Sequence, residues 1–161
     1  MSVVNSSLQV PDPFIADQNK ITTAVAADLE RKGFETTFGN HQSAIDLRAA
    51  KGELIFHIES RGNQALAHIG TNKVYKTDQI SIHLPEQVNQ IMRFMQSHKE
   101  RIDPIFIIAN PDIKRFRLQV SRIEKALNKL GIVQAWVDVN GDVTYRGQPE
   151  FINLLGLNYS I

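Results

Sequence analysis

The segment Ile105-Phe-Ile-Ile-Ala109 places the strongest limit on how this chain folds. It is a continuous apolar run, with Pro104 before it and Asn110-Pro111 after it. Successive strand residues point to opposite faces of a sheet, so such a run predicts a strand that is buried on both faces. A strand of this kind needs other elements above and below it, and this requirement favours an α/β architecture.

The remaining segments supply helices and further strands for this architecture. Asp17 or Asn19 caps a predicted helix that runs to about Lys32, and Gly33 then favours a stop. Between this helix and the buried strand, the patterns predict a strand over Phe34–Phe38, a hairpin of Ser43–Ala49 and Glu53–Glu59, a loop over 62–83 and a helix from Pro85 to about Lys99. After the buried strand they predict a helix from Asn110 to Gly131, then strands over Ile132–Val139 and Asp142–Tyr145, and a short helix from Gln148. The dipeptide Asn140-Gly141 predicts a type I′ turn between these two strands.

This order of elements predicts the fold class and the domain organisation. Strands that alternate with helices indicate an α/β protein, with a central mixed β-sheet flanked by helices on both faces. We expect one domain over residues 14–161 and an irregular lead-in over residues 1–13, which are polar and contain two prolines.

The composition excludes several classes of function. The 161 residues carry a net charge of +1, so a nucleic-acid surface would have to be a local patch. The chain has no cysteine, which excludes disulfides, thiolate metal sites and a cysteine nucleophile. No apolar run approaches the roughly 20 residues of a membrane span, and no secretory signal is evident. We therefore expect a cytoplasmic protein without a membrane partner.

The hairpin carries the residues that are chemically most informative. Strand residues two apart share a face, so His57, Glu59 and Arg61 are expected to point the same way. The pairing of the hairpin lets Asp46, on its first strand, face the same row. Two carboxylates then converge beside a cation. The repulsion between the two carboxylates is usually balanced by a divalent metal ion or by an ion-pair network.

At this point the chain resembles the PD-(D/E)XK nuclease superfamily, which includes type II restriction enzymes and Holliday-junction resolvases. The family core is a helix, a three-stranded meander with Asp on its second strand and Glu-x-Lys on its third, and then a helix and a strand. Ile45-Asp46-Leu47 is similar to the first acidic position, and Ile58-Glu59-Ser60-Arg61-Gly62 is similar to the Glu-x-Lys-Gly segment. The resemblance covers roughly residues 17–110.

The resemblance implies a restriction endonuclease-like fold, with an αβββαβ core followed by a C-terminal helix and β-hairpin. It implies a DNA endonuclease that depends on Mg²⁺ or Mn²⁺, with DNA as its partner, and it is compatible with a homodimer. Asp46 and Glu59 would be the metal ligands and catalytic acids, and Arg61 would contact the scissile phosphate. In chemical terms, a metal held by two carboxylates keeps several waters and polarises a phosphate oxygen.

Two positions depart from the family pattern. Arg61 stands at the family's lysine position, and a guanidinium can clamp a phosphate but is always protonated, so it cannot be a general base. The first helix has Thr22 and Thr23 where family members often have a glutamate, so we expect one metal site at most.

These departures leave three interpretations of the hairpin open. One is an active nuclease. Another is the same fold with a degenerate active site, serving as a non-catalytic module that binds nucleic acid or another protein. The third is purely structural, with Glu59 paired to Arg61 and Asp46 paired to Arg48, because most surface charges are solvated and weakly paired.

Auxiliary residues are expected near the hairpin. His57 shares the face of Glu59, although a lone histidine in a strand is more often a core residue. Gln87 and Gln90 begin the helix that follows, where a polar side chain can reach metal-bound water or simply face solvent. Lys73 is a further candidate source of an ammonium group, and nothing in the sequence fixes its position.

The helix after the buried strand is basic. Its Lys114-Arg-Phe-Arg117 segment predicts a surface that follows a phosphate backbone, with Arg115 and Arg122 as the expected nucleic-acid contacts. The alternative is an ordinary solvated helix face. Trp136, in the strand that follows, is expected to lie in the core.

Overall fold

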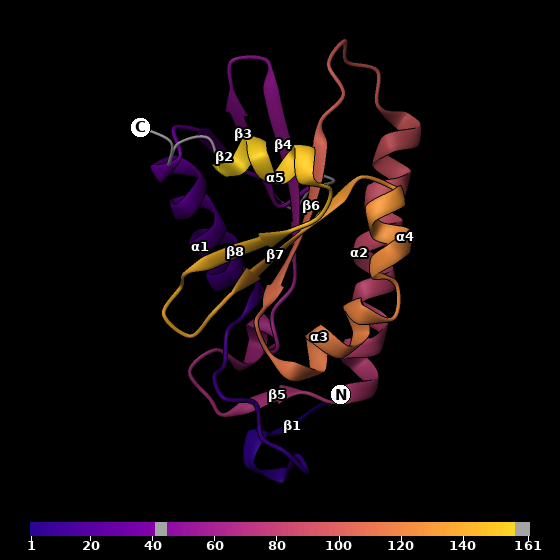
Figure 1. Ribbon diagram of the computed structural model, residues 1–161. Coiled ribbons are helices and arrows are strands. Elements are labelled where there is room, and N and C mark those ends of the chain that lie inside the picture. The colour runs from indigo at the N-terminus through magenta and orange to yellow at the C-terminus, as the bar shows by residue number, and fades with distance from the viewer. Residues whose placement is uncertain (41–44, 157–161) are drawn as a thin grey trace.

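The computed structural model describes residues 1–40 and 45–156, and a six-stranded mixed sheet forms its centre (Figure 1). In chain order the strands are β2 (Glu35–Phe38), β3 (Leu47–Lys51), β4 (Leu54–Ser60), β6 (Ile105–Pro111), β7 (Ile132–Val137) and β8 (Val143–Arg146). Their order across the sheet is β2-β3-β4-β6-β7-β8. The first three strands form an antiparallel meander, β4, β6 and β7 are parallel, and β8 returns antiparallel to β7.

Strand β6 confirms the prediction made from the apolar run. Its side chains alternate between two apolar layers: Ile107 and Ala109 pack in one layer, whereas Phe106 and Ile108 pack in the other. All four residues are buried. Because β6 also has a neighbouring strand on each side, its backbone donors and acceptors are paired within the sheet.

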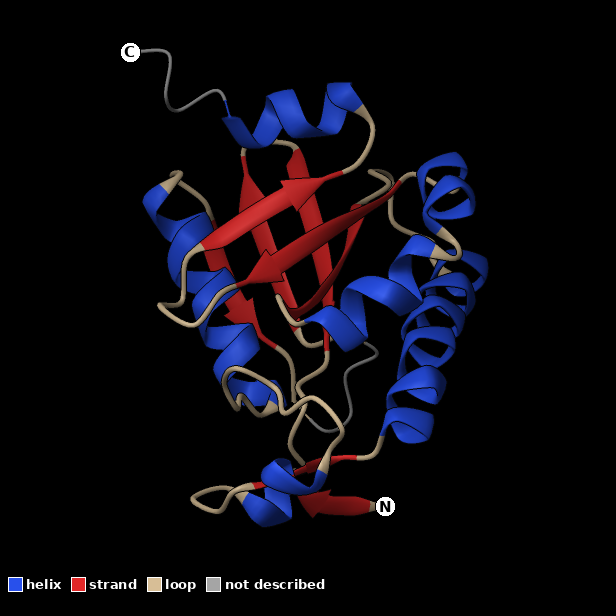
Figure 2. Cartoon of the chain, turned by 60° about the horizontal axis from the view of Figure 1, so that its bottom comes forward, coloured by secondary structure: helices blue, strands red, loops and turns tan. Residues whose placement is uncertain are grey.

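Helices cover both faces of the sheet (Figure 2). The layer that contains Ile107 is completed by residues of α1 (Gln18–Arg31) and α5 (Pro149–Gly156). The layer that contains Ile108 is completed by α2 (Thr77–Ser97), α3 (Lys114–Ser121) and α4 (Glu124–Lys129). The predicted α/β class with a mixed sheet between helices is therefore confirmed. No helix in the described ranges is long and apolar enough to cross a membrane.

The first helix begins and ends as its sequence predicts. The Asp17 carboxylate accepts hydrogen bonds from the backbone N–H groups of Asn19 and Lys20, at 2.9 and 3.1 Å. At the other end Gly33 has φ of 91°, the left-handed conformation that follows many helices. The N-terminal cap fixes the first turn of α1, which forms part of the candidate site described below.

Helix α2 begins at Thr77, earlier than the predicted start at Pro85, which lies inside the helix. The proline removes one intrahelical hydrogen bond. However, Ile80 and Leu84 are buried in the apolar layer that α2 covers, and this burial stabilises the additional turns. The prediction of a loop is therefore wrong for the last residues of the 62–83 segment.

The single helix predicted between Asn110 and Gly131 is two helices, α3 and α4. Ile123, between them, has φ of −131° and ψ of 11°, outside the helical range, so the axis breaks there. Val120 and Leu127, on either side of the break, are both buried in the same apolar layer.

A separate two-stranded sheet joins β1 (Ser2–Val4) to β5 (Lys73–Tyr75). A short 3₁₀ helix, η1 (Asn5–Ser7), follows β1, and another, η2 (Leu66–His68), precedes β5. The sequence predicted an irregular segment over residues 1–13, whereas the structure places a strand and a 3₁₀ helix in it. Strands of three residues are too short to show alternation, and the pairing of β1 depends on a segment far along the chain.

Buried polar contacts fasten the N-terminal segment to the rest of the chain. Asp12 forms an ion pair with Arg115, in which Nε donates to Oδ1 at 2.8 Å, and it accepts a hydrogen bond from the Asn63 side chain at 3.0 Å. The backbone N–H of Asn63 donates to the carbonyl of Ala16 at 2.9 Å. The neighbouring Gly62 has to be glycine, because a Cβ there would lie 2.2 Å from that carbonyl oxygen.

Candidate active site

Asp46 lies directly before β3, where three segments fix its position. Its Oδ2 accepts a hydrogen bond from the backbone N–H of Ser60 at 2.8 Å, and its Oδ1 accepts one from the Gln18 side chain at 2.8 Å. Its backbone carbonyl accepts a hydrogen bond from the N–H of Gly39 at 2.8 Å. The carboxylate is therefore held between the first turn of α1 and the end of β4.

Glu59 lies near the end of β4, between β3 and β6, and is only 5% exposed. Burial raises the pKa of its carboxyl to about 8, and the negative charge of Asp46 contributes to this rise. The positive charge of Arg61 and a hydrogen bond from it act in the opposite direction. Burial also raises the pKa of Asp46, against the hydrogen bond from Ser60 and the charge of Arg61. Two acids at neighbouring strand ends therefore repel each other, as expected from the sequence.

Arg61 follows β4 and interacts with its end. One terminal nitrogen lies 3.4 Å from Oε2 of Glu59, and the same nitrogen donates to the carbonyl of Ser60 at 2.9 Å. The Arg61 side chain remains about one-fifth exposed, at 21%. Its charge lowers the pKa of His83 on α2, after the larger effect of burial. The guanidinium therefore supplies positive charge between Glu59 and the first turns of α2.

Two glutamines complete the surroundings of the acids. Gln18 contacts Asp46, and no pattern in the sequence indicates this contact because it depends on how α1 packs against β4. Gln87 is buried on α2, and its Nε2 donates to the carbonyls of Glu59 and Ala109, at 3.2 and 3.4 Å. Gln87 therefore links α2 to the ends of β4 and β6. The sequence predicted Gln87 at the start of this helix, with a role toward metal-bound water or solvent, whereas it lies in the middle of α2 and its amide binds main-chain carbonyls.

A polar pocket of about 190 Å³ opens next to Asp46. Its lining comes from the first turns of α1, from the end of β2 and from Asp46, and includes Gln18, Asn19, Thr22, Thr23 and Phe38. This pocket is also lined by Thr22 and Thr23, which stand where family members often have a glutamate. Phe38 is an exposed aromatic residue at the rim of this pocket.

Three predicted auxiliary residues lie elsewhere or have other contacts. His57 is 3% exposed, and its ring makes edge contacts with Phe94 and Phe106 at centroid distances of 4.7 and 5.9 Å. Burial lowers its pKa to about 4, so it is a neutral core residue at pH 7. Gln90 lines a pocket on α2 together with Phe94, and Lys73 is exposed at the start of β5.

The two arginines predicted to contact nucleic acid have different surroundings. Arg115 is directed inward: besides its ion pair with Asp12, it donates to the carbonyl of Tyr75 at 2.7 Å, and its side chain is 12% exposed. Arg122, between α3 and α4, is exposed. The contact of Arg122 with nucleic acid stays a prediction, whereas the contacts of Arg115 give it a structural role.

The residues present are compatible with one hard divalent cation. Within the described ranges, no group of three or more His, Asp or Glu side chains is arranged to hold a metal ion. Mg²⁺, however, is commonly held by one or two protein carboxylates, with water and substrate phosphate as its other ligands. Asp46 and Glu59 provide such a pair, and a cation between them would relieve the repulsion that raises the pKa of Glu59.

Comparisons of the chain with protein-family models, with curated proteins and with solved structures give no match. The function therefore has to be inferred from the residues of the site and their geometry.

Proposed function

We propose that this protein is a nuclease-like phosphodiesterase of the PD-(D/E)XK type, which uses Mg²⁺ or Mn²⁺ to act on DNA. The observation that carries the proposal is the pair Asp46 and Glu59, two carboxyl groups with raised pKa values at neighbouring strand ends. Burying two interacting acids is unfavourable for folding. Acids with perturbed pKa values cluster at functional sites, and a divalent cation held by both carboxylates would balance their charge.

The order of elements supports the same proposal. The order of the family's αβββαβ core is matched by α1, the β2-β3-β4 meander, α2 and β6. The short elements η2 and β5 lie between β4 and α2, and β5 belongs to the separate two-stranded sheet. Asp46 precedes the second strand of the meander, and Glu59 and Arg61 stand at the end of the third. Strand β6 then pairs in parallel with β4, beside the acids. The basic segment α3 and the β7-β8 hairpin follow this core.

Each residue has a chemical role in the proposal. Asp46 and Glu59 would hold the cation, which supplies polarisation of a phosphate oxygen and a more acidic water when bound. Gln18 orients the Asp46 carboxylate through its 2.8 Å hydrogen bond. Arg61 would contact the scissile phosphate, because it can donate to phosphate oxygens in pairs but cannot accept a proton at neutral pH.

Cleavage of plasmid and branched DNA with Mg²⁺ or Mn²⁺ tests this proposal. Wild type should cleave, and Asp46→Asn and Glu59→Gln should lose at least about a hundredfold in rate, because each removes one charge from the cation site without changing side-chain shape. Glu35→Gln removes an exposed carboxylate from β2 and should cleave like wild type. Absence of metal-dependent cleavage, or equal cleavage by all four proteins, would exclude the catalytic proposal.

A second function, a non-catalytic module that binds nucleic acid or another protein, is favoured by one observation. Arg61 contacts both Glu59 and the carbonyl of Ser60, so an internal cation already offsets part of the negative charge. This function predicts no heat of Mg²⁺ or Mn²⁺ binding in titration calorimetry, together with salt-sensitive DNA binding. Arg61→Lys separates the two functions further, since cleavage that appears only in this variant indicates a recently degenerate active site.

A further inference from the structure

A second pocket, of about 200 Å³, lies between the α3–α4 segment and the β7–β8 edge of the sheet. We call it the β7 pocket, and its chemically relevant lining residues are Arg117, Glu124, Gln134, Trp136 and Arg146. It shares no lining residue with the pocket beside Asp46. Gln134 on β7 pairs directly with Arg146 on β8, so their side chains lie on the same face of the sheet.

Two buried donors in this lining have no acceptor. Within residues 1–40 and 45–156, neither Nε2 of Gln134 nor Nε1 of Trp136 has a hydrogen-bond partner, and both side chains are only 2% exposed. A buried donor without a partner destabilises the folded state, because it has given up its hydrogen bond to water. The indole N–H can only donate, so rotation of a side chain cannot turn it into an acceptor. Both residues line the same pocket, and a ligand with acceptor oxygens would satisfy them together.

Two arginines border these donors. The Arg117 guanidinium lies over the Trp136 ring at 4.1 Å and donates to the Asp112 carboxylate through two nitrogens, at 2.7 and 3.1 Å. Arg146 lies 3.1 Å from a Glu124 oxygen, and its side chain is 59% exposed. A guanidinium carries five N–H donors, so these ion pairs orient both arginines and leave further donors for a ligand.

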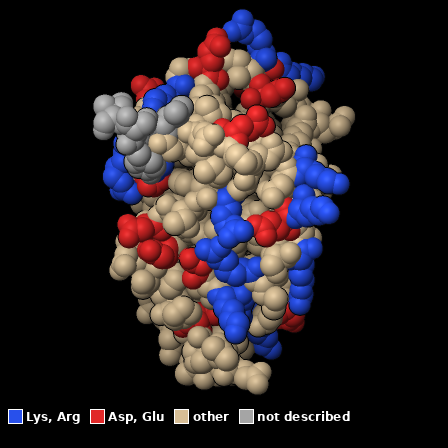
Figure 3. Space-filling model, in the orientation of Figure 1, with Lys and Arg blue, Asp and Glu red and all other residues tan. Residues whose placement is uncertain are grey.

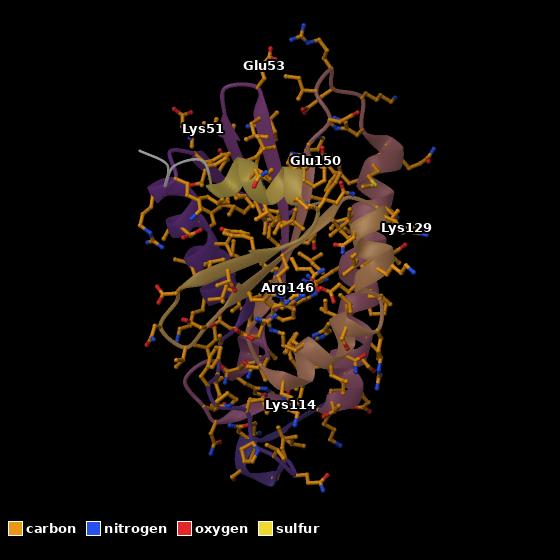
Figure 4. The ribbon with its side chains drawn as sticks, in the orientation of Figure 1. Lys51, Glu53, Lys114, Lys129, Arg146 and Glu150 are labelled. Carbon is orange, nitrogen blue, oxygen red and sulfur yellow. The ribbon has the colours of Figure 1, made fainter. Side chains whose placement is uncertain are left out.

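The wider surroundings of the pocket are positively charged. The segment Lys114–Lys129 contains six basic residues and one acidic residue. Figure 3 shows Lys and Arg side chains gathered in a band down the middle of the face that carries α3. In Figure 4, Arg146 lies between the β7–β8 ribbon and α3–α4, on the face that also carries Lys114 and Lys129. Such a field attracts anions toward the pocket.

We propose that the β7 pocket binds a phosphate group. An ionised phosphate oxygen accepts hydrogen bonds and cannot donate them. Here such oxygens would meet an indole N–H, an amide N–H and two guanidinium groups, and the Glu124 carboxylate that also lines the pocket is paired with Arg146. The phosphate has two chemical sources: a free phosphate or mononucleotide, or the backbone of a DNA strand. The proposal does not depend on the nuclease proposal, because it uses none of the residues around Asp46 and Glu59.

The only tryptophan of the chain makes the proposal directly measurable. The indole ¹H–¹⁵N signal of Trp136 should move saturably as inorganic phosphate is added, and should not move with sodium chloride at the same ionic strength. Arg146→Gln should weaken the apparent affinity for phosphate by about tenfold, because it removes one charge-assisted interaction. Arg93→Gln removes the same charge from an exposed residue of α2 that does not line the pocket, and should change the affinity by less than about twofold.

Gln134→Met separates a ligand site from a structural contact. It removes a donor that has no partner, so the variant should be at least as stable as wild type without phosphate and yet bind phosphate more weakly. A short single-stranded DNA that moves the indole signal at a lower concentration of phosphate groups than free phosphate identifies the backbone as the source, and the reverse order identifies a free phosphate. An indole signal that responds to neither ligand beyond chloride, or equal losses in Arg146→Gln and Arg93→Gln, would overturn the proposal.

Discussion

The negative charge of Asp46 adds to the effect of burial on Glu59, and together they raise the pKa of Glu59 to about 8. The two acids stand at the ends of paired strands, and the guanidinium of Arg61, 3.4 Å from Glu59, offsets this rise only in part. The same relationship that suggests a cation site therefore has a consequence for folding that can be measured without any ligand.

Glu59→Gln should remove a pH dependence of stability. The folded state keeps the Glu59 proton up to a pH of about 8, whereas the unfolded chain releases it near the ordinary value of 4.5. Between these values the folded state binds more protons, so the stability of the wild type falls as pH rises. The fall should be on the order of 4 kcal/mol between pH 5 and pH 9. Urea unfolding across this range should show it in the wild type and a flatter profile in Glu59→Gln.

Glu35→Gln, on the exposed face of β2, is the matched control and should keep the wild-type slope. If Glu59→Gln were to lose as much stability as the wild type between pH 5 and pH 9, Glu59 would not be the group that holds the proton.

Arg115→Met should be strongly destabilising, although the basic pattern of its segment suggests a surface residue. The substitution would leave Asp12 buried without its cation, and breaking a buried ion pair in this way costs about 3–5 kcal/mol. The double variant Asp12→Asn/Arg115→Met should recover part of that loss. Arg122→Met, which changes an exposed arginine of the same segment, should stay within about 0.5 kcal/mol of wild type. Chemical unfolding of the four proteins measures these differences, and equal effects of the two single substitutions would contradict the structural role of Arg115.

Gly62→Ala should destabilise the fold because of the backbone crossing beside it. The added Cβ would lie 2.2 Å from the Ala16 carbonyl oxygen, and backbone atoms cannot move aside as a flexible side chain can. We expect a loss of about 2 kcal/mol or more. Gly147→Ala is the control, since a Cβ there would lie 3.4 Å from the nearest atoms of Val133, an ordinary contact. Thermal unfolding that gave both variants the same midpoint would contradict this account of Gly62.

The sequence predicts the features of the fold that depend on local pattern. The apolar run of β6 indicates a strand between two layers, and the cap at Asp17 and the stop at Gly33 define α1. Predictions fail where tertiary burial overrides local preference, as at Pro85 inside α2. At Asn140-Gly141 only the glycine has positive φ, so the predicted type I′ turn, which needs both residues in that conformation, does not form.

The candidate site shows the same division between local pattern and tertiary packing. The proximity of Asp46 and Glu59 follows from hairpin pairing and the two-residue period of strands, so the sequence could predict it. The contact between Gln18 and Asp46 joins residues 28 positions apart, and that between Arg115 and Asp12 joins residues 103 positions apart. Both depend on packing that no local pattern records. For that reason the sequence missed Gln18 and suggested an exposed role for Arg115.

Gln18→Glu tests whether a third carboxylate beside Asp46 and Glu59 strengthens the binding of a divalent cation. The new carboxylate would take the place of an amide that donates to Asp46 at 2.8 Å, so a hydrogen bond becomes a repulsion between like charges. Without metal, the variant should lose about 1–3 kcal/mol of stability at pH 8, where an uncompensated third acid is most unfavourable. With Mn²⁺ the order should reverse, because a third carboxylate strengthens binding of a hard cation by roughly tenfold. Calorimetric titration with Mn²⁺ and thermal unfolding with and without the ion measure both effects.

Thr23→Glu, which adds a carboxylate at the rim of the same pocket without breaking the contact to Asp46, is the comparison variant. Equal and metal-independent behaviour of Gln18→Glu and wild type would mean that the space between Asp46, Glu59 and the first turn of α1 does not hold a cation.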